Sequence, residues 1–227
     1  MPAAVIVTGA AGALGHAVVS EFLAAGRPVV ALDRPGERID ALGAQDGVHA
    51  VAVDLSSRAA VRTAFEAVDA LPVTATALVG LAGGFTPGAL ADIDEHTLDG
   101  LWRSNFGSAL WTAQAAAPRF AAQGGGAIVT VGSKTAVGGP APLAHATSKA
   151  AVVRLTQLLA EELRGQRIRV NAVLPSVIDT PANRAWMSDG LAARAVAPAA
   201  IAKVIAFLCS PDAAPISGAA IPVYGDA

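Results

Sequence analysis

Short runs of β-branched and other apolar residues recur along the chain, and each is of a length typical of one buried strand. Seven runs are candidate strands: residues 4–8, 28–32, 48–53, 76–83, 126–133, 168–175 and 219–225. Segments with apolar residues at helical spacing lie between most of them, at 14–25, 57–69, 95–121, 145–164 and 198–209. Alternation of strands and helices implies right-handed crossovers and a parallel sheet. We therefore predict an α/β fold: a doubly wound parallel sheet of about seven strands with helices on both faces.

No internal repeat or low-complexity linker interrupts this pattern, so we interpret residues 1–227 as a single domain. Glycine and proline cluster at 83–88, 138–142 and 210–218, which predicts loops. Loops that follow parallel strands gather at the carboxyl edge of the sheet, where such folds bind ligands. The segment 178–197 is the least regular, and we interpret it as the substrate loop, either a mobile lid or a surface loop with a short helix.

Composition narrows the function classes. Hydrophobic residues make up 53% of the chain and charged residues 15%, which indicates fully buried strands, an oligomer interface, or both. The net charge of −2 gives no electrostatic footprint for nucleic acid. The single cysteine, Cys209, cannot form an internal disulfide, and no basic leader or long uninterrupted apolar stretch predicts a signal peptide or a membrane span. We expect a cytoplasmic protein without nucleic-acid or membrane partners.

The first predicted strand runs into a glycine-rich turn and a helix. Gly9, Gly12 and Gly15 permit a tight turn in which backbone N–H groups at the helix start can approach a pyrophosphate. Asp33 follows the second predicted strand, 18 residues after Gly15, where a carboxylate can accept hydrogen bonds from an adenosine ribose. Together these features predict a Rossmann-type dinucleotide-binding fold. Asp33 favours NAD(H) because it repels a 2′-phosphate, whereas the neighbouring Arg34 keeps NADP(H) as the alternative.

A second candidate site lies where a proline-rich loop runs into the helical segment 145–164. His145 and Lys149 are one helical turn apart, so both side chains can point into the same cleft. An imidazole exchanges protons near neutrality, and a nearby ammonium favours its neutral form by lowering its pKa. The other histidines, His16, His49 and His96, show no metal-binding spacing, and we expect no metal.

With this helix added, the sequence resembles the short-chain dehydrogenase/reductase family over nearly its whole length. The matching segments are the glycine loop, DLS at 54–56, GLAG at 80–83, Asn105, Ser133, HATSK at 145–149, RVNAVLPSVIDT at 169–180 and the terminal SGAAIPVYG. The resemblance implies hydride transfer between a nicotinamide cofactor and a carbonyl or secondary alcohol of a small-molecule substrate. It also implies a homodimer or homotetramer that pairs the helices at 95–121 and 145–164.

The resemblance assigns roles to individual residues. The implied catalytic set is Asn105 for a proton path, Ser133 to orient the substrate oxygen, His145 at the acid/base position, and Lys149 to hold the nicotinamide ribose. The implied cofactor-binding set is Gly9, Gly12, Ala13, Leu14, Gly15, Asp33, Arg34, Asp54, Leu55, Ala82, Gly83, Lys149, Pro175, Val177 and Thr180.

Three departures from the family pattern bear on the chemistry. Ala13 occupies the second glycine position of the loop. The loop from Ser133 to His145 is one residue shorter than usual, so Thr135 is the alternative to Ser133. His145 replaces the family tyrosine, and the chain's only tyrosine, Tyr224, lies in the last predicted strand.

Three functions are compatible with this replacement. The first is an NAD(H)-dependent oxidoreductase in which His145 is an unusual acid/base. The second is a non-redox enzyme that uses His145 as a base for cyclisation, elimination or isomerisation on the same scaffold. The third is a dinucleotide-binding protein without catalysis.

Overall fold

The computed structural model describes residues 1–226 and contains one seven-stranded sheet in the order β3-β2-β1-β4-β5-β6-β7. Its strands are β1 (Ala3–Thr8), β2 (Val29–Asp33), β3 (Val48–Ala52), β4 (Thr74–Gly80), β5 (Gly126–Val131), β6 (Ile168–Pro175) and β7 (Ala220–Val223). Every neighbouring pair is parallel. The order reverses beside β1, which makes the sheet doubly wound, as predicted.

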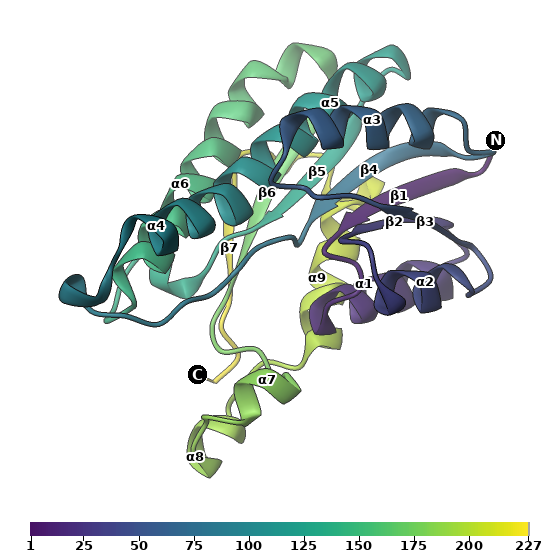
Figure 1. Cartoon of the computed structure of the whole chain (residues 1–227). Helices are drawn as coiled ribbons and strands as arrows, with labels where there is room; N and C mark the ends of the chain where they lie inside the picture. The colour runs from purple at the N-terminus through teal and green to yellow at the C-terminus, as the bar shows by residue number, and fades with distance from the viewer. Residues whose placement is uncertain (227) are drawn as a thin grey trace.

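Helices cover both faces of this sheet (Figure 1). They are α1 (Ala13–Ala24), α2 (Glu37–Gly43), α3 (Arg58–Asp69), α4 (Glu95–Leu101), α5 (Ser108–Ala122), α6 (Leu143–Glu162), α7 (Pro181–Arg184), α8 (Asp189–Ala192) and α9 (Pro198–Leu208). Short 3-10 turns are η1 (Leu90–Asp92), η3 (Lys134–Ala136), η4 (Arg164–Gln166) and η5 (Pro211–Ala213), and η2 (Trp102–Gly107) is a π-helical segment between α4 and α5.

Alternate side chains of each central strand enter two separate cores. Val5 and Val7 pack with residues of α1, α2 and α9, whereas Ala4 and Ile6 pack with residues of α3, α5 and α6. Because both faces of the strands are buried, the strands read in sequence as continuous apolar runs instead of alternating patterns. This explains why the inner strands could be predicted from the sequence.

Two predicted boundaries differ from the structure in ways that concern the site. The run at 76–83 leaves the sheet after Gly80, and the run at 126–133 leaves it after Val131, so the residues that follow both strands are loops at the carboxyl edge. The predicted helix 95–121 contains the π-helical segment η2, in which one residue is inserted into the turn. Helix α2 was not predicted, because seven residues with only Ile39 and Leu42 buried carry too little periodic signal.

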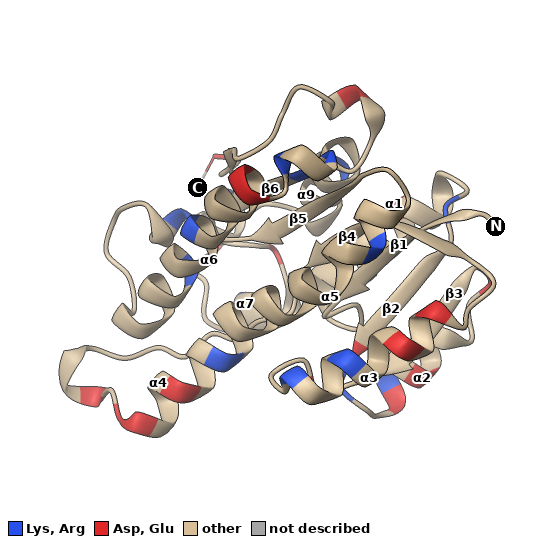
Figure 2. Cartoon of the chain, turned by 90° about the horizontal axis from the view of Figure 1, so that it is seen from above, with Lys and Arg blue, Asp and Glu red and all other residues tan. Residues whose placement is uncertain are grey.

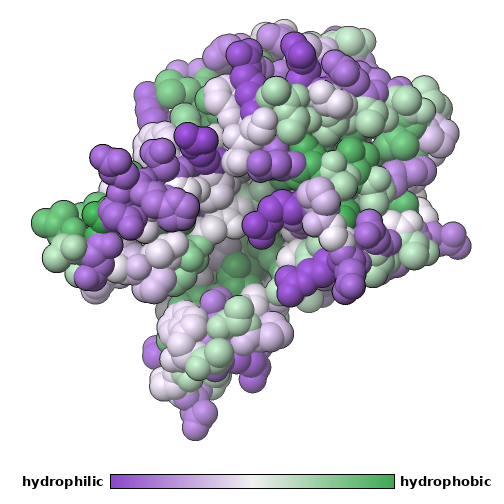
Figure 3. Space-filling model, viewed as in Figure 1, coloured by the Kyte–Doolittle hydropathy of each residue, from purple (hydrophilic) through white to green (hydrophobic). Residues whose placement is uncertain are grey.

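The predicted substrate loop 178–197 projects from the carboxyl edge and carries α7 and α8 (Figure 1). Its two ends are joined by a parallel bridge between Ile178 and Val196. The Asp179 N–H donates to the Val196 carbonyl at 2.8 Å, and the Val196 N–H donates to the Val177 carbonyl at 2.8 Å. Figure 3 shows the molecule hollowed between this segment and the main body. None of the described helices is long and apolar enough to cross a membrane.

Candidate active site

Close backbone packing explains the glycines of the loop between β1 and α1. Gly9 has a φ of 65°, and a Cβ built on it would lie 2.8 Å from the Ala82 backbone nitrogen. A Cβ on Gly15 would lie 2.3 Å from the Gly9 carbonyl oxygen. Gly12 begins α1 without a side-chain cap, so the first N–H groups of the helix, from Ala13 and Leu14 onwards, remain available to a ligand. This arrangement fits a pyrophosphate at the helix start.

A groove of about 990 Å³ runs from the glycine loop along the carboxyl edge of the sheet. Eight of the predicted cofactor-binding residues line it: Gly9, Gly12, Asp33, Arg34, Asp54, Leu55, Ala82 and Gly83. Ala13, Leu14, Gly15, Lys149, Pro175, Val177 and Thr180 are not among its lining residues. Ser56, the last residue of the DLS segment, lines it as well, and sequence reasoning missed Arg38. Arg38 was missed because α2, on which it lies, was not predicted.

Asp33 connects the end of β2 to the glycine loop. One carboxylate oxygen accepts the Ala11 N–H at 2.8 Å, and the other accepts the Arg34 N–H at 2.7 Å. A carboxylate oxygen has more than one lone pair, so each can still accept a ribose hydroxyl. Asp54 is held by Ser56, whose N–H and hydroxyl both donate to it, and these hydrogen bonds lower the pKa of Asp54. The carboxylates of Asp33 and Asp54 therefore both line the groove, as does that of Glu37.

Asn105, on η2, is 1% exposed and clamps the backbone of Gly84, which follows β4. The Gly84 N–H donates to Asn105 Oδ1 at 2.9 Å, and Asn105 Nδ2 donates back to the Gly84 carbonyl at 3.2 Å. Asn105 Nδ2 also donates to the Ser148 hydroxyl on α6 at 2.9 Å. The π-helical insertion thus carries a buried amide that joins the β4–α4 loop to α6.

His145 lies in the first turn of α6 and contacts the same loop. Its Nδ1 is 3.2 Å from the Gly84 carbonyl oxygen, and its ring meets the ring of Phe85 edge-on at 5.0 Å. Burial, reinforced by the Lys149 ammonium, lowers the pKa of His145, and the Gly84 carbonyl opposes this. Gly84 itself lines the groove, so the imidazole is hydrogen-bonded to a groove residue.

Lys149 is buried one helical turn further along α6. Its ammonium donates to the Val131 carbonyl, at the end of β5, at 2.9 Å, and burial lowers its pKa to about 8. A Cβ on Gly83 would lie 3.2 Å from Lys149 Nζ and 2.5 Å from Asn105 Oδ1. The bare backbone at position 83 therefore allows the lysine, the asparagine and a groove residue to lie together.

The hydroxyls of Ser133 and Thr135, the two candidates for orienting the substrate oxygen, lie side by side at the start of η3. Ser133 Oγ and Thr135 Oγ1 are 2.7 Å apart, and Ser133 Oγ also accepts the Thr135 N–H at 3.2 Å. Thr180 caps α7 by accepting the Asn183 N–H at 3.2 Å. The ring centroid of Tyr224 lies 5.2 Å from Lys134 Nζ.

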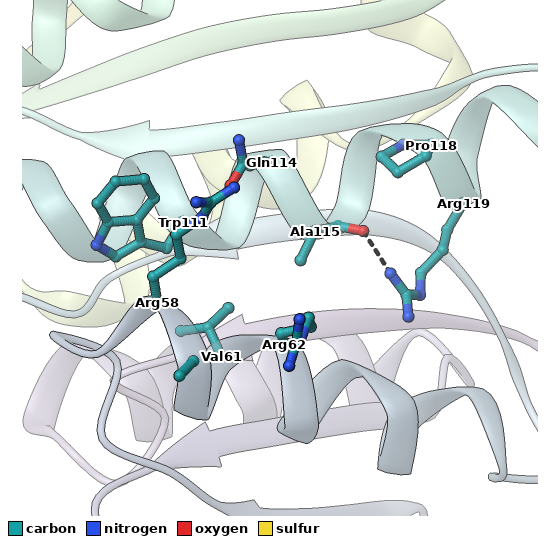
Figure 4. A pocket seen from close by; sticks show the side chains of 9 residues that line it. Arg58, Val61, Arg62, Trp111, Gln114, Ala115, Pro118 and Arg119 are labelled. Atoms are coloured by element: carbon teal, nitrogen blue, oxygen red, sulfur yellow. Dashed lines mark hydrogen bonds between the residues drawn. The ribbon is translucent and has the colours of Figure 1, made fainter.

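A second groove, of about 540 Å³, lies between α3 and α5 (Figure 4). Arg58 Cζ lies 5.6 Å from the ring centroid of Trp111, and Arg58 Nε donates to Gln114 Oε1 at 2.9 Å. None of the predicted site residues lines this groove. Within residues 1–226, no group of three or more His, Cys, Asp or Glu side chains could hold a metal ion.

Comparisons with known proteins agree with this geometry. The family model described as short chain dehydrogenase matches residues 3–190. The chain is 34% identical to 4-formylbenzenesulfonate dehydrogenase of Comamonas testosteroni, with 97% of this chain and 95% of that protein covered. It is 30% identical to a 3-oxoacyl-[acyl-carrier-protein] reductase of Thermotoga maritima, with 97% and 95% covered.

A solved structure gives the same result in three dimensions. The 3-ketoacyl-(acyl-carrier-protein) reductase of Brucella melitensis, complexed with NADH, superposes with a TM-score of 0.90 at 29% identity over 98% of this chain and 96% of that one. The glycine loop between β1 and α1, the groove beside it, and the neighbouring side chains of Asn105 and Lys149 thus occur in a chain that belongs to the short-chain dehydrogenase/reductase family.

Proposed function

We propose that this protein is an NAD(H)-dependent oxidoreductase that transfers a hydride between nicotinamide and a carbonyl or secondary alcohol, with His145 as its acid/base. One observation carries the proposal: the imidazole is hydrogen-bonded to Gly84, a residue of the groove that fits the dinucleotide. A proton-transfer group beside the groove is what a hydride-transfer enzyme needs at this place. Nicotinamide, when bound, supplies the hydride or accepts it.

The residues of the chain have separate tasks in this proposal. The N–H groups at the start of α1 bind the pyrophosphate, and Asp33 accepts the adenosine ribose hydroxyls. One N–H of the Lys149 ammonium donates to the Val131 carbonyl, and the other two remain available to bind the nicotinamide ribose. Ser133, paired with Thr135, orients the substrate oxygen, and Thr180 contacts the nicotinamide carboxamide at the start of α7.

Cofactor titration followed by turnover tests the proposal. NADH is expected to bind with a change in its fluorescence, and a panel of carbonyls and secondary alcohols is expected to change nicotinamide absorbance. Binding without turnover of any member would favour a silent dinucleotide-binding protein. Substrate conversion without net change in absorbance would favour a non-redox enzyme. Either result overturns the proposed hydride transfer.

Asp33 supports NAD(H) over NADP(H), and its charge can be removed while one of its two hydrogen bonds, the one from the Ala11 N–H, is kept. The substitution Asp33→Asn keeps an oxygen that accepts the Ala11 N–H but no longer repels a 2′-phosphate. We expect the ratio of NADPH to NADH affinity to rise by at least about tenfold, which corresponds to about 1.4 kcal/mol. Fluorescence titration with both nucleotides measures this ratio. Asp40→Asn, on the exposed side of α2, is the matched control.

An unchanged ratio in the Asp33→Asn protein would contradict the assignment of Asp33 to the adenosine ribose. It would direct attention to Arg34 and Arg38, which line the same end of the groove and could bind a phosphate.

We also propose that two or four copies associate through α4–α6. Large apolar side chains remain exposed there: Leu98 and Leu158 are 45% exposed, and Trp102 is 44% exposed. Trp102 contacts Phe106 at 5.3 Å between ring centroids, so two aromatic side chains lie together on η2. Light scattering measures the number of copies, and a monomer would contradict the proposal.

Charged residues of both signs stand close together on α2 and α3 (Figure 2), which fits a small-molecule enzyme without a nucleic-acid partner.

The state of the Cys209 thiol is relevant to the cellular compartment of the protein. The thiol is buried, and burial raises its pKa to about 12, so it is unreactive and without a partner for a disulfide within the chain. This supports a place in the reducing cytoplasm.

A further inference from the structure

The hydrogen bond between His145 and Gly84 determines which ring nitrogen holds the proton of the neutral imidazole. A carbonyl oxygen can only accept, so the 3.2 Å contact requires a proton on Nδ1. A neutral imidazole carries one N–H, so Nε2 must then present a lone pair.

Nε2 is the ring nitrogen that has no hydrogen-bond partner among the described residues of the protein. Within the described part of the chain, Nε2 makes no hydrogen bond, and no buried side-chain nitrogen or oxygen lacks a partner. Nε2 is therefore not completely buried, although the residue as a whole is only 9% exposed. One ring nitrogen is occupied by the backbone, and the other is free to react.

The carbonyl that selects the tautomer is itself held in place. Asn105 bonds both the N–H and the carbonyl of Gly84, and Ser148 anchors Asn105 from α6. Ser148 in turn donates to the His145 carbonyl at 2.8 Å. Asn105, Gly84, Ser148 and His145 thus form a closed set of hydrogen bonds that fixes the ring relative to the groove wall.

We infer that the Gly84 carbonyl, positioned by Asn105, holds neutral His145 as the Nδ1–H tautomer, so that Nε2 is the reacting atom and His145 enters the cycle as a base on a secondary alcohol. The inference rests on the proposed function and refines it. The alcohol O–H bond breaks and its proton forms an N–H bond at Nε2. The carbinol C–H bond breaks and its electron pair moves with the hydrogen to NAD⁺, leaving a carbonyl, NADH and an imidazolium.

A histidine differs from the family's tyrosine in how many atoms accept and donate hydrogen bonds. A phenol uses one oxygen both as acceptor and as donor, whereas the imidazole divides these tasks between two nitrogens. The groups packed on the ring are Lys149 from α6, Gly84 and Phe85 from the loop after β4, and, through Gly84, Asn105 from η2. Of these, Lys149 carries a charge, and that charge opposes protonation of the ring. At neutral pH the free protein therefore holds the base needed for alcohol oxidation.

Ring ¹⁵N NMR of histidine-labelled protein tests the tautomer without any need for turnover. The His145 signals are assigned by their loss in His145→Phe, and His96→Gln removes the signals of an exposed histidine as a control. At neutral pH we expect a protonated Nδ1 and an unprotonated Nε2. An Nε2–H tautomer, or a fully protonated ring, would overturn the inference whether or not the protein is active.

Asn105→Ala tests the positioning role. Loss of the clamp frees the Gly84 carbonyl, and we expect a mixture of both tautomers in place of one. A single unchanged Nδ1–H tautomer in a folded Asn105→Ala protein would show that Asn105 is structural only. If that variant does not fold, the wild-type spectrum still decides the tautomer, and a scalar coupling from Nδ1–H across to the Gly84 carbonyl tests the contact directly.

The pH dependence of initial rates separates this inference from the proposed function. Burial and Lys149 lower the pKa of His145, so kcat/KM for alcohol oxidation should be flat at neutral pH and fall about tenfold per pH unit below a pKa under about 6.5. Carbonyl reduction should instead fall as the pH rises through that pKa. An Nδ1–H tautomer with no turnover would contradict only the proposed function. Turnover whose oxidation rate does not fall in acid would contradict the base role.

Discussion

Replacing His145 with phenylalanine is expected to lower kcat for alcohol oxidation by about 10²–10⁴-fold, the usual contribution of a positioned acid/base group. Phenylalanine keeps a planar ring that can still meet Phe85 edge-on, but it has neither ring nitrogen. The Gly84 carbonyl keeps its hydrogen bond from Asn105, so no buried backbone acceptor loses its last partner. We therefore expect a folded protein whose NADH affinity is unchanged.

Initial-rate kinetics and NADH titration of the same preparation measure the two quantities. His96→Phe makes the same chemical change at an exposed position on α4 and should leave both unchanged. His145→Tyr restores the tyrosine of the family pattern. The rate of carbonyl reduction should rise in this variant if the wild-type protein is limited only by proton donation from His145. Wild-type oxidation rates in His145→Phe would contradict the proposed role of the imidazole. A Tyr variant that binds NADH yet stays inactive would weaken the case for redox chemistry.

The elements predicted from sequence are those whose signal is local. The inner strands were found because they are buried on both faces, and the position of Asp33 followed from the glycine loop and the end of β2. The pairing of His145 with Lys149 followed from helical spacing alone. Such features depend on residues within one element or one strand–helix–strand unit, and a single sequence displays them directly.

The features that were missed depend on distant contacts. Residues 84 and 145 are 61 positions apart, and their hydrogen bond uses a backbone carbonyl, which has no sequence signature. The π-helical insertion at Asn105 is likewise invisible in a pattern that reads 95–121 as one helix. For this reason the replacement of tyrosine by histidine could be seen in sequence, but the preferred tautomer of that histidine required the structure.

The substitution Gly15→Ala is expected to have the second large effect, on stability and NADH affinity. The added methyl group would clash with backbone atoms, which cannot rotate out of its way as a side chain can. The Cβ of Gly15→Ala would lie 2.3 Å from the Gly9 carbonyl oxygen and 2.4 Å from that of Ala10. The glycine loop and the start of α1 must therefore separate, at a cost of about 1–3 kcal/mol or more in the free energy of unfolding. For a chain of this size each kcal/mol lowers Tm by about 2–4 °C.

The same separation moves the N–H groups at the start of α1, so NADH affinity should fall together with Tm. Calorimetry with and without NADH measures both effects, because a ligand that binds only the folded state raises Tm. Gly165→Ala is the matched control: nothing lies within 4 Å of its added Cβ, and its backbone does not need a positive φ. That change should leave Tm equal or slightly raised, since alanine restricts the unfolded chain. A Gly15→Ala protein with wild-type Tm and NADH affinity would show that the loop is not packed against α1 in this way, and the dinucleotide cradle would have to be placed elsewhere.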